Sequence, residues 1–195
     1  MFYPNLKFPR VKNRPFFYTN FVQTIDGKVQ VKSPGYWPIG SRTDYQVLTE
    51  LRAYADCLIH GKNLYQEFGN ITKESLKRQQ FRALRKKLGR NPDLPYLIGT
   101  HDLKKLSKDL YKKGYKNVLV EGGPTLLGSF LKENLINEVF LTIAPKIYGT
   151  EPGKTLTLIE GILLKPDQIK NLKLLSVKQI ENELYLRYKI FEGLI

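Results

Sequence analysis

The sequence predicts an α/β fold with a mostly parallel central sheet, helices on both faces and a C-terminal antiparallel hairpin. Three observations lead to this prediction. Short β-branched and apolar runs alternate with segments whose apolar residues recur at helical spacing. Glycines follow several of the predicted strands, as they do where a strand turns into a helix. Residues 172–191 then form two strand-like runs across Glu181-Asn182-Glu183, which adds an antiparallel edge.

The first third of the chain begins the alternation. Phe16–Thr24 is predicted as a strand, and Asp26-Gly27-Lys28 turns the chain into a second short strand, Val29–Val31. Proline and glycine indicate a loop over Ser33–Ser41. Apolar residues at helical spacing predict a helix over Thr43–Ala55.

The middle of the chain continues it with a strand at Cys57–His60 and a basic segment, Lys73–Arg90. Eight basic residues there face one acid, Glu74, and the apolar residues fall near helical spacing, which predicts one amphipathic helix with a solvated basic face. Tyr96–Thr100 is predicted as a strand.

The last elements complete the sheet. A helix is predicted over Leu103–Lys113, ended by Gly114 as a C-cap. A buried strand around Val118-Leu119-Val120 precedes another helical pattern, and Glu138–Ile143 is a strand. The closing hairpin pairs Leu172–Gln179 with Leu184–Phe191.

Length and composition predict one domain over residues 1–195, with residues 1–14 as an N-terminal extension. The single cysteine, Cys57, excludes an internal disulfide and a cysteine metal site, and its apolar neighbours indicate a reduced core thiol. The start of the chain lacks an apolar signal core, and no apolar run reaches the ~20 residues that cross a bilayer. We therefore expect a cytoplasmic protein without a membrane segment or a metal site.

The net charge of +14 raises the question of nucleic-acid binding. The basic segment Lys73–Arg90 could hold RNA or DNA. However, the chain shows neither an aromatic–basic single-strand platform nor a zinc module. A polyanionic small molecule explains the sign of the charge equally well.

The stretch from Asn117 to Leu131 carries the strongest chemical signal. It predicts a strand, a turn at Gly122-Gly123 and a helix, so a ligand could approach bare backbone beside a helix N-terminus that favours phosphate. Glu121 stands at the carboxyl end of the strand, where open α/β sheets place their chemistry. An ordinary tight turn would give the same pattern.

Two further corners, His60-Gly61-Lys62 and Gly99-Thr100-His101, also follow predicted strands. A dinucleotide needs one place for its pyrophosphate and another for its ribose phosphate. Lys62, or His101 beside Thr100, would suit a 2′-phosphate, which favours NADPH over NADH. The GxGxxG fingerprint is absent, so such a site would belong to a fold other than the Rossmann fold.

Five blocks in order resemble the reductase domain of riboflavin biosynthesis, the C-terminal domain of bifunctional deaminase-reductases. The blocks are Thr24-Ile25-Asp26-Gly27-Lys28, Trp37 to Ser41, Leu51-Arg52-Ala53-Tyr54-Ala55-Asp56, Val120-Glu121-Gly122-Gly123-Pro124-Thr125 and Ala144-Pro145-Lys146-Ile147-Tyr148-Gly149. The resemblance implies a dihydrofolate-reductase-like three-layer fold, NADPH as hydride donor and a homodimer. It also implies reduction of an aminopyrimidine ribosylamino phosphate to the ribitylamino phosphate by hydride transfer to C1′.

The resemblance also implies roles for individual residues. Glu121 and Asn20 would lie at the reacting centre. Contacts with the phosphorylated substrate fall on Lys28, Trp37, Ser41 and Arg52. Contacts with the cofactor fall on Val22, Gly61, Lys62, Thr100, Gly122, Gly123 and Thr125.

Several of these roles have plainer alternatives. Lys62 could simply be solvated, Trp37 could fill its loop, and Glu121 could be a surface carboxylate. Arg52 could pair with Asp56 one helical turn later. If Glu121 acts in the site, its replacement by alanine is expected to cut turnover with little loss of folding.

The chain also departs from the family pattern. The Asp-Asn-Pro and Leu-Thr-x-Arg stretches that grip the substrate are missing after Gly61. The alternatives are therefore a dihydrofolate or pterin reductase of the same fold, or a non-catalytic relative that binds nucleic acid.

Overall fold

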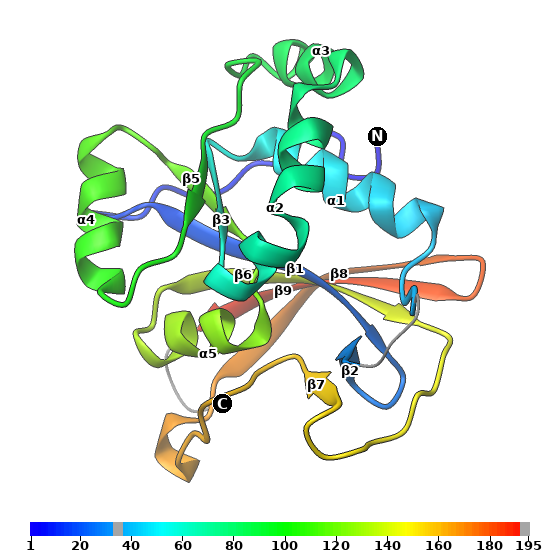
Figure 1. Cartoon of the computed structure of the whole chain (residues 1–195). Coiled ribbons are helices and arrows are strands. Elements are labelled where there is room, and N and C mark those ends of the chain that lie inside the picture. The colour runs from blue at the N-terminus through cyan, green and yellow to red at the C-terminus, as the bar shows by residue number, and fades with distance from the viewer. Residues whose placement is uncertain (33–36, 192–195) are drawn as a thin grey trace.

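The computed structural model describes residues 1–32 and 37–191 and contains a seven-stranded mixed sheet (Figure 1). The strand order is β4-β3-β5-β1-β6-β9-β8, in which the first five strands are parallel and β9 and β8 are antiparallel. Their bounds are β1 Phe16–Thr24, β3 Cys57–His60, β4 Tyr96–Ile98, β5 Asn117–Val120, β6 Ile136–Ala144, β8 Asn171–Ile180 and β9 Glu183–Phe191. The predicted fold class and closing hairpin are confirmed.

Helices cover both faces of this sheet (Figure 1). They are α1 Arg42–Tyr54, α2 Lys62–Lys77, α3 Gln79–Lys87, α4 Leu103–Lys112 and α5 Pro124–Lys132, with a short 3-10 turn, η1, at Pro166–Gln168. Alternation along β1 divides the core, because Tyr18 faces α1 to α3 and Phe17 faces α4 and α5. The predicted helices thus pack onto the sheet as two apolar layers.

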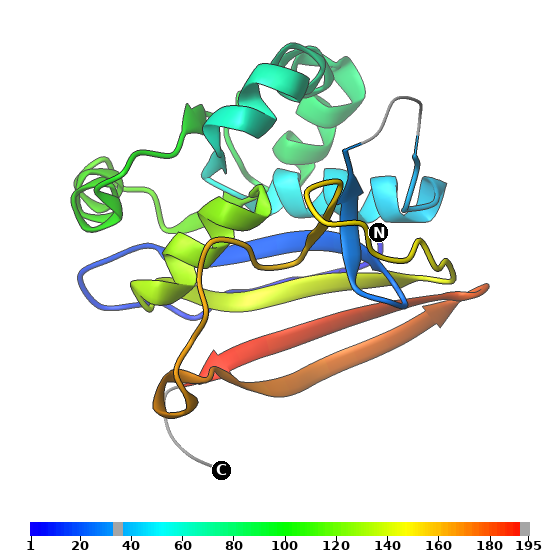
Figure 2. The same ribbon diagram turned by 60° about the horizontal axis from the view of Figure 1, so that its bottom comes forward.

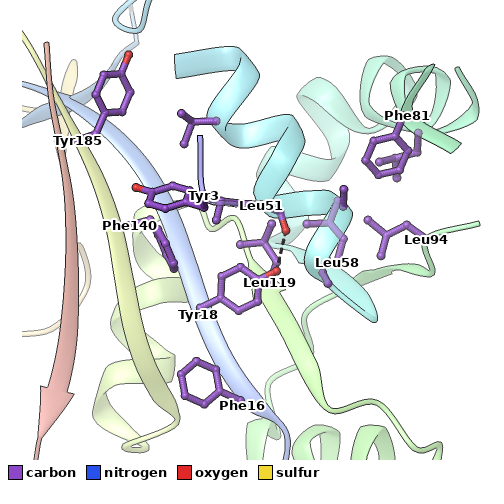
Figure 3. Packing of buried hydrophobic residues seen from close by; sticks show 14 residues of the cluster. Tyr3, Phe16, Tyr18, Leu51, Leu58, Phe81, Leu94, Leu119, Phe140 and Tyr185 are labelled. Carbon is purple, nitrogen blue, oxygen red and sulfur yellow. Dashed lines mark hydrogen bonds between the residues drawn. The ribbon is translucent and has the colours of Figure 1, made fainter. Parts of the chain in front are cut away.

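Figure 3 shows the first of these layers, in which Tyr18 and Phe140 from the sheet meet Leu51 of α1 and Phe81 of α3. The Tyr18 hydroxyl donates to the Leu51 carbonyl at 2.7 Å, so the buried phenol keeps a hydrogen bond. Tyr3 belongs to the same layer. Residues at the start of the chain therefore pack into the core, although the sequence suggests an extension over residues 1–14.

The basic segment Lys73–Arg90 is not one helix. The chain leaves helical geometry at Arg78 (φ −57°, ψ 136°), which ends α2 and begins α3. Its basic face is not wholly solvated either. Arg85 is 1% exposed and donates to the carbonyls of Arg52, Ala53 and Ala55 at the end of α1. Carbonyls at the end of a helix lack the usual N–H partner one turn later. The Arg52 carbonyl accepts from the Ala55 N–H, and the guanidinium is a further donor to all three carbonyls.

Other local differences are small. Gly114, at φ +82°, follows α4 as the predicted C-cap. The turn at Gly27 (φ +80°) leads into β2, Lys28–Val31, which pairs with the unpredicted β7, Thr155–Thr157, as a separate ribbon. Part of the predicted loop, residues 33–36, lies outside the described residues. Within the described ranges, no helix is long and apolar enough to cross a membrane, and no cluster of three His, Cys, Asp or Glu could hold a metal ion.

Candidate active site

The glycine-containing turns that follow β3, β4 and β5, at Gly61, Gly99 and Gly122-Gly123, meet at the carboxyl ends of these strands. The Gly61 N–H donates to the Gly122 carbonyl at 2.5 Å, and the Gly99 N–H donates to the His60 carbonyl at 2.8 Å. A Cβ at Gly61 would lie 3.3 Å from the Gly122 oxygen and the Gly123 nitrogen. Two of the three turns that the sequence predicts to favour phosphate, at Gly61 and at Gly122-Gly123, are therefore in direct contact.

Two helices begin at these strand ends without a side-chain cap. Gly61 precedes α2 and Gly123 precedes α5, whereas α1 and α4 are capped by Ser41 and Asp102. The first N–H groups of a helix need partners, and here neither a side chain nor a first-turn acid supplies one. These two helix ends can therefore receive an anion.

The space in front of the second corner is open. A Cβ at Gly123 would meet no atom within 4 Å, whereas one at Gly122 (φ +86°) would lie 2.5 Å from Phe21 Cζ. Around it, Lys62, Thr100 and Thr125 are exposed. The open backbone at Gly123 and the uncapped helix ends supply free N–H donors, so the residues present fit the phosphate groups of a dinucleotide.

Glu121, directly after β5, is the centre of a buried polar network. Its side chain is 6% exposed, which excludes a surface carboxylate. Arg52 holds both oxygens, with Nε to Oε1 and Nη2 to Oε2 each at 2.6 Å. The alternative pair of Arg52 with Asp56 is not formed, since Asp56 binds Arg90 instead. A bidentate pair of this kind fixes both side chains.

His60 approaches the same carboxylate from the end of β3, with 2.7 Å between Nε2 and Glu121 Oε2. An ionised carboxylate only accepts, so Nε2 carries the hydrogen in this contact. The Tyr96 hydroxyl, from β4, lies 2.7 Å from His60 Nδ1 and can donate to it. Arg52 of α1 and His60 of β3 therefore bind Glu121 directly, and Tyr96 of β4 supports His60.

Electrostatics decide the charge of this carboxyl group. Burial raises the pKa of Glu121, but Arg52 and His60 together outweigh burial and lower its pKa to about 2. Burial, reinforced by the Glu121 charge, raises the pKa of Tyr96 to about 12. At neutral pH Glu121 is thus an anion and Tyr96 a neutral donor, so Glu121 cannot act as a proton donor there.

Asn20 lies beside Glu121. Thr19 of β1 pairs with Val120 of β5, so the next residue of each strand stands at the same edge. Asn20 is buried, and its Oδ1 accepts no hydrogen bond from the described residues. Since buried polar atoms are nearly always paired, this oxygen suits a donor from a bound molecule.

The other predicted substrate residues, and Val22 of the predicted cofactor site, have different surroundings. Ser41 caps α1 and its hydroxyl donates to Glu183 at 2.5 Å, so it lies at the opposite end of that helix from Arg52. Trp37 is half-exposed and packs edge-on against Tyr148. Lys28 is buried at the start of β2, and Val22 is half-buried on β1. Contacts and strand register place Asn20, Arg52 and Glu121 with the glycine turns at one end of the sheet. The roles of Ser41, Trp37 and Lys28 at the substrate, and of Val22 at the cofactor, stay predictions.

Sequence reasoning missed the roles of His60 and Tyr96 as partners in the network. The available signal was a polar His60 at the end of an otherwise apolar strand. Its contact with Glu121 depends on the pairing of β3 with β5, and its contact with Tyr96 on the pairing of β3 with β4. Neither pairing can be read from neighbouring residues alone.

Comparisons with known proteins show the family of this chain. The family model described as the RibD C-terminal domain matches residues 69–186. A 2,5-diamino-6-ribosylamino-4(3H)-pyrimidinone 5′-phosphate reductase from Methanothermobacter thermautotrophicus is 25% identical over 91% of this chain and 99% of its own length. Riboflavin biosynthesis protein RibD from Buchnera aphidicola is 41% identical over 85 residues, and that match spans only 22% of the Buchnera protein.

Solved structures show the same fold at low identity. A pyrimidine reductase-like protein from Corynebacterium diphtheriae superposes with a TM-score of 0.70 at 19% identity, over 93% of this chain and 94% of that one. Dihydrofolate reductase from Enterococcus faecalis gives a TM-score of 0.53 at 10% identity, over 90% and 96% of the two chains. The dihydrofolate-reductase-like architecture is therefore confirmed.

Proposed function

The chain belongs to the RibD C-terminal domain family, and from this premise we propose that it is an NADPH-dependent pyrimidine reductase. Its reaction would be hydride transfer to C1′ of an aminopyrimidine ribosylamino phosphate, opened to the imine, which gives the ribitylamino phosphate. One observation carries this proposal. The open turn at Gly122-Gly123 and the buried Glu121 network lie together at the carboxyl ends of the parallel strands. NADPH, when bound, supplies the hydride.

The chain's own residues would act mainly by positioning and by charge. The uncapped N-termini of α2 and α5 would hold the pyrophosphate. The anionic Glu121 would stabilise the positive charge of a protonated imine, in a place where burial strengthens electrostatic interactions. Asn20 Oδ1 would accept a hydrogen bond from a sugar hydroxyl. Together these contacts would hold donor and acceptor in reactive geometry.

Thr125→Asp tests the cofactor site without a large cost in folding. Thr125 is exposed in the first turn of α5, where a negative charge favours the helix. The same charge would repel a pyrophosphate, so we expect the Kd for NADPH to rise about tenfold or more, equivalent to ~1.4 kcal/mol. Ser129→Asp, one turn further along α5, is the matched control. Equal NADPH affinity in both variants and the parent would exclude this cofactor site.

The substrate is tested by following NADPH oxidation at 340 nm. The aminopyrimidine ribose phosphate and dihydrofolate are supplied in turn to the same enzyme preparation. We expect turnover with the first alone. Turnover with dihydrofolate alone would replace the proposed substrate, and a steep salt dependence of oligonucleotide binding would favour a nucleic-acid role.

We also propose that the protein is a homodimer formed through the β8–β9 hairpin, which lies at the sheet edge away from α1 to α3 (Figure 2). Leu174 and Val177 on β8 are 47% and 54% exposed, and they pair with Tyr188 and Leu186 on the same face. A long, apolar edge strand is normally covered in solution. Val177→Asp should shift the protein to a monomer in sedimentation, whereas an unchanged sedimentation coefficient would exclude this interface.

A further inference from the structure

A cavity of about 210 Å³ lies between α1, α2 and α3, next to the Glu121 network. Its volume is below the ~300–1,000 Å³ of pockets that enclose a whole ligand, so it suits one end of a molecule. The wall combines apolar side chains with basic and neutral hydrogen-bonding groups. The lining residues are Tyr45, Thr49, Arg52, Ser75, Leu76, Arg78, Gln80, Phe81 and Leu84.

Arg52 forms the wall that this cavity shares with the reacting centre. Three of its five guanidinium N–H groups have partners, two on Glu121 and one, at 3.4 Å, on the Ser75 hydroxyl. The remaining donors bind none of the described residues. Because Glu121 fixes the guanidinium plane, Arg52 is already in place for a ligand on its other side.

Arg78 adds an uncompensated positive charge to the same cavity. It is the non-helical residue between α2 and α3, and it makes no ion pair within the described ranges. The N-terminus of α3, which follows it, has neither a side-chain cap nor an acid in its first turn. Gln80 of that turn also lines the cavity. Charge and donors of this kind favour a compact anion.

We propose that this cavity binds the phosphomonoester end of the sugar substrate, with Arg78 as its recognition residue. This inference rests on the proposed function, because a phosphate here would point the sugar toward Glu121 across Arg52. It also accounts for the missing Asp-Asn-Pro and Leu-Thr-x-Arg stretches, since α2 and α3 occupy the segment where they would follow Gly61. Ser41 lies at the far end of α1 and takes no part.

The larger cavity, of about 390 Å³, does not compete for this role. It lies at the amino ends of the parallel strands, beside Arg14 and the start of β6. Glu121 lies at the carboxyl ends of these strands, on the opposite side of the molecule from this cavity.

Arg78→Gln and Lys77→Gln form a matched pair for the test. Both remove one positive charge from neighbouring exposed residues, but Arg78 alone lines the cavity. Ribose 5-phosphate is titrated into the parent and into each variant by calorimetry. We expect its Kd to rise about tenfold in Arg78→Gln and to stay within about twofold in Lys77→Gln, since charged hydrogen bonds are stronger than screened surface charges.

Steady-state kinetics with the aminopyrimidine ribose phosphate supply a second readout. Arg78→Gln should raise KM about tenfold with kcat little changed, and a dephosphorylated substrate should not distinguish it from the parent. Failure of ribose 5-phosphate to bind the parent, or equal binding to all three proteins, overturns the phosphate site. If the binding difference stands but no turnover occurs with NADPH, the proposed function fails and the phosphate site remains.

Discussion

Replacing Glu121 by glutamine is expected to destabilise the protein as well as to slow it. Sequence alone leads us to expect little loss of folding when Glu121 is replaced by alanine, whereas the buried ion pair predicts a loss of stability. The variant leaves the Arg52 guanidinium buried without its counterion. Removing one partner of a buried pair costs about 3–5 kcal/mol.

The pKa of Glu121 gives a second route to the magnitude. Arg52 and His60 outweigh burial and lower the pKa from 4.5 to about 2, and each unit corresponds to ~1.4 kcal/mol, which gives roughly 3–4 kcal/mol at neutral pH. The two routes agree. For a chain of 195 residues, a loss of 3–5 kcal/mol lowers Tm by roughly 6–20 °C.

The sign of the pH dependence follows from the lowered pKa. The folded carboxyl binds its proton more weakly than the unfolded one, so its stabilisation is present above pH 4.5 and is lost as the pH falls toward 2. The difference in unfolding free energy between the parent and Glu121→Gln isolates this group, because other carboxyl groups titrate in both proteins. That difference should shrink by roughly 1 kcal/mol between pH 7 and pH 3.5.

Urea unfolding of both proteins at the two pH values measures this difference. Glu74→Gln is the control, since Glu74 pairs with Lys77 at the surface and its loss should leave the unfolding midpoint unchanged. A destabilisation of Glu121→Gln that stays constant from pH 7 to pH 3.5 would refute the ion-pair reasoning. A midpoint equal to that of the parent at pH 7 would refute it as well.

Two further predictions concern the basic segment and the cofactor. Arg85→Met should lower the unfolding free energy by roughly 3 kcal/mol, because three carbonyls at the end of α1 lose the guanidinium as a donor. Lys86 is the next residue and is exposed, so Lys86→Met should have no measurable effect in the same urea titration. NADPH should raise Tm more than NADH at equal concentration if Lys62, or His101 beside Thr100, binds a 2′-phosphate, and equal shifts in a thermal melt would contradict that.

The fold could be predicted because its signals are local. Glycine corners, apolar strands and the closing hairpin are each read from a short stretch of chain. The helix break at Arg78 could not be predicted, because the residues on either side continue the helical spacing of apolar residues. The amphipathic face of Lys73–Arg90 is therefore continuous in sequence. Arg85 escaped for a related reason: its partners are backbone carbonyls of α1, about 30 residues earlier, and no side-chain pattern marks them.

In the candidate site, too, some contacts could be predicted from short stretches of sequence and others could not. Gly61, Gly122 and Gly123 meet as expected because β3 and β5 are neighbours in a parallel sheet. The sequence leaves Arg52 open between a contact with the phosphorylated substrate and a pair with Asp56 one turn away. The structure decides for Glu121, because a buried carboxylate needs a buried cation, whereas Asp56 is already held by Arg90.

That choice of partner has a consequence for recognition. A guanidinium held on one side by Glu121 is committed in orientation, so the groups on its other side, Ser75 and Arg78, determine what can bind there. A helix break at Arg78 is what brings that side chain to the cavity wall, since it turns the chain from α2 into α3. Restoring a continuous helix through this position should therefore weaken ribose 5-phosphate binding even with the arginine retained.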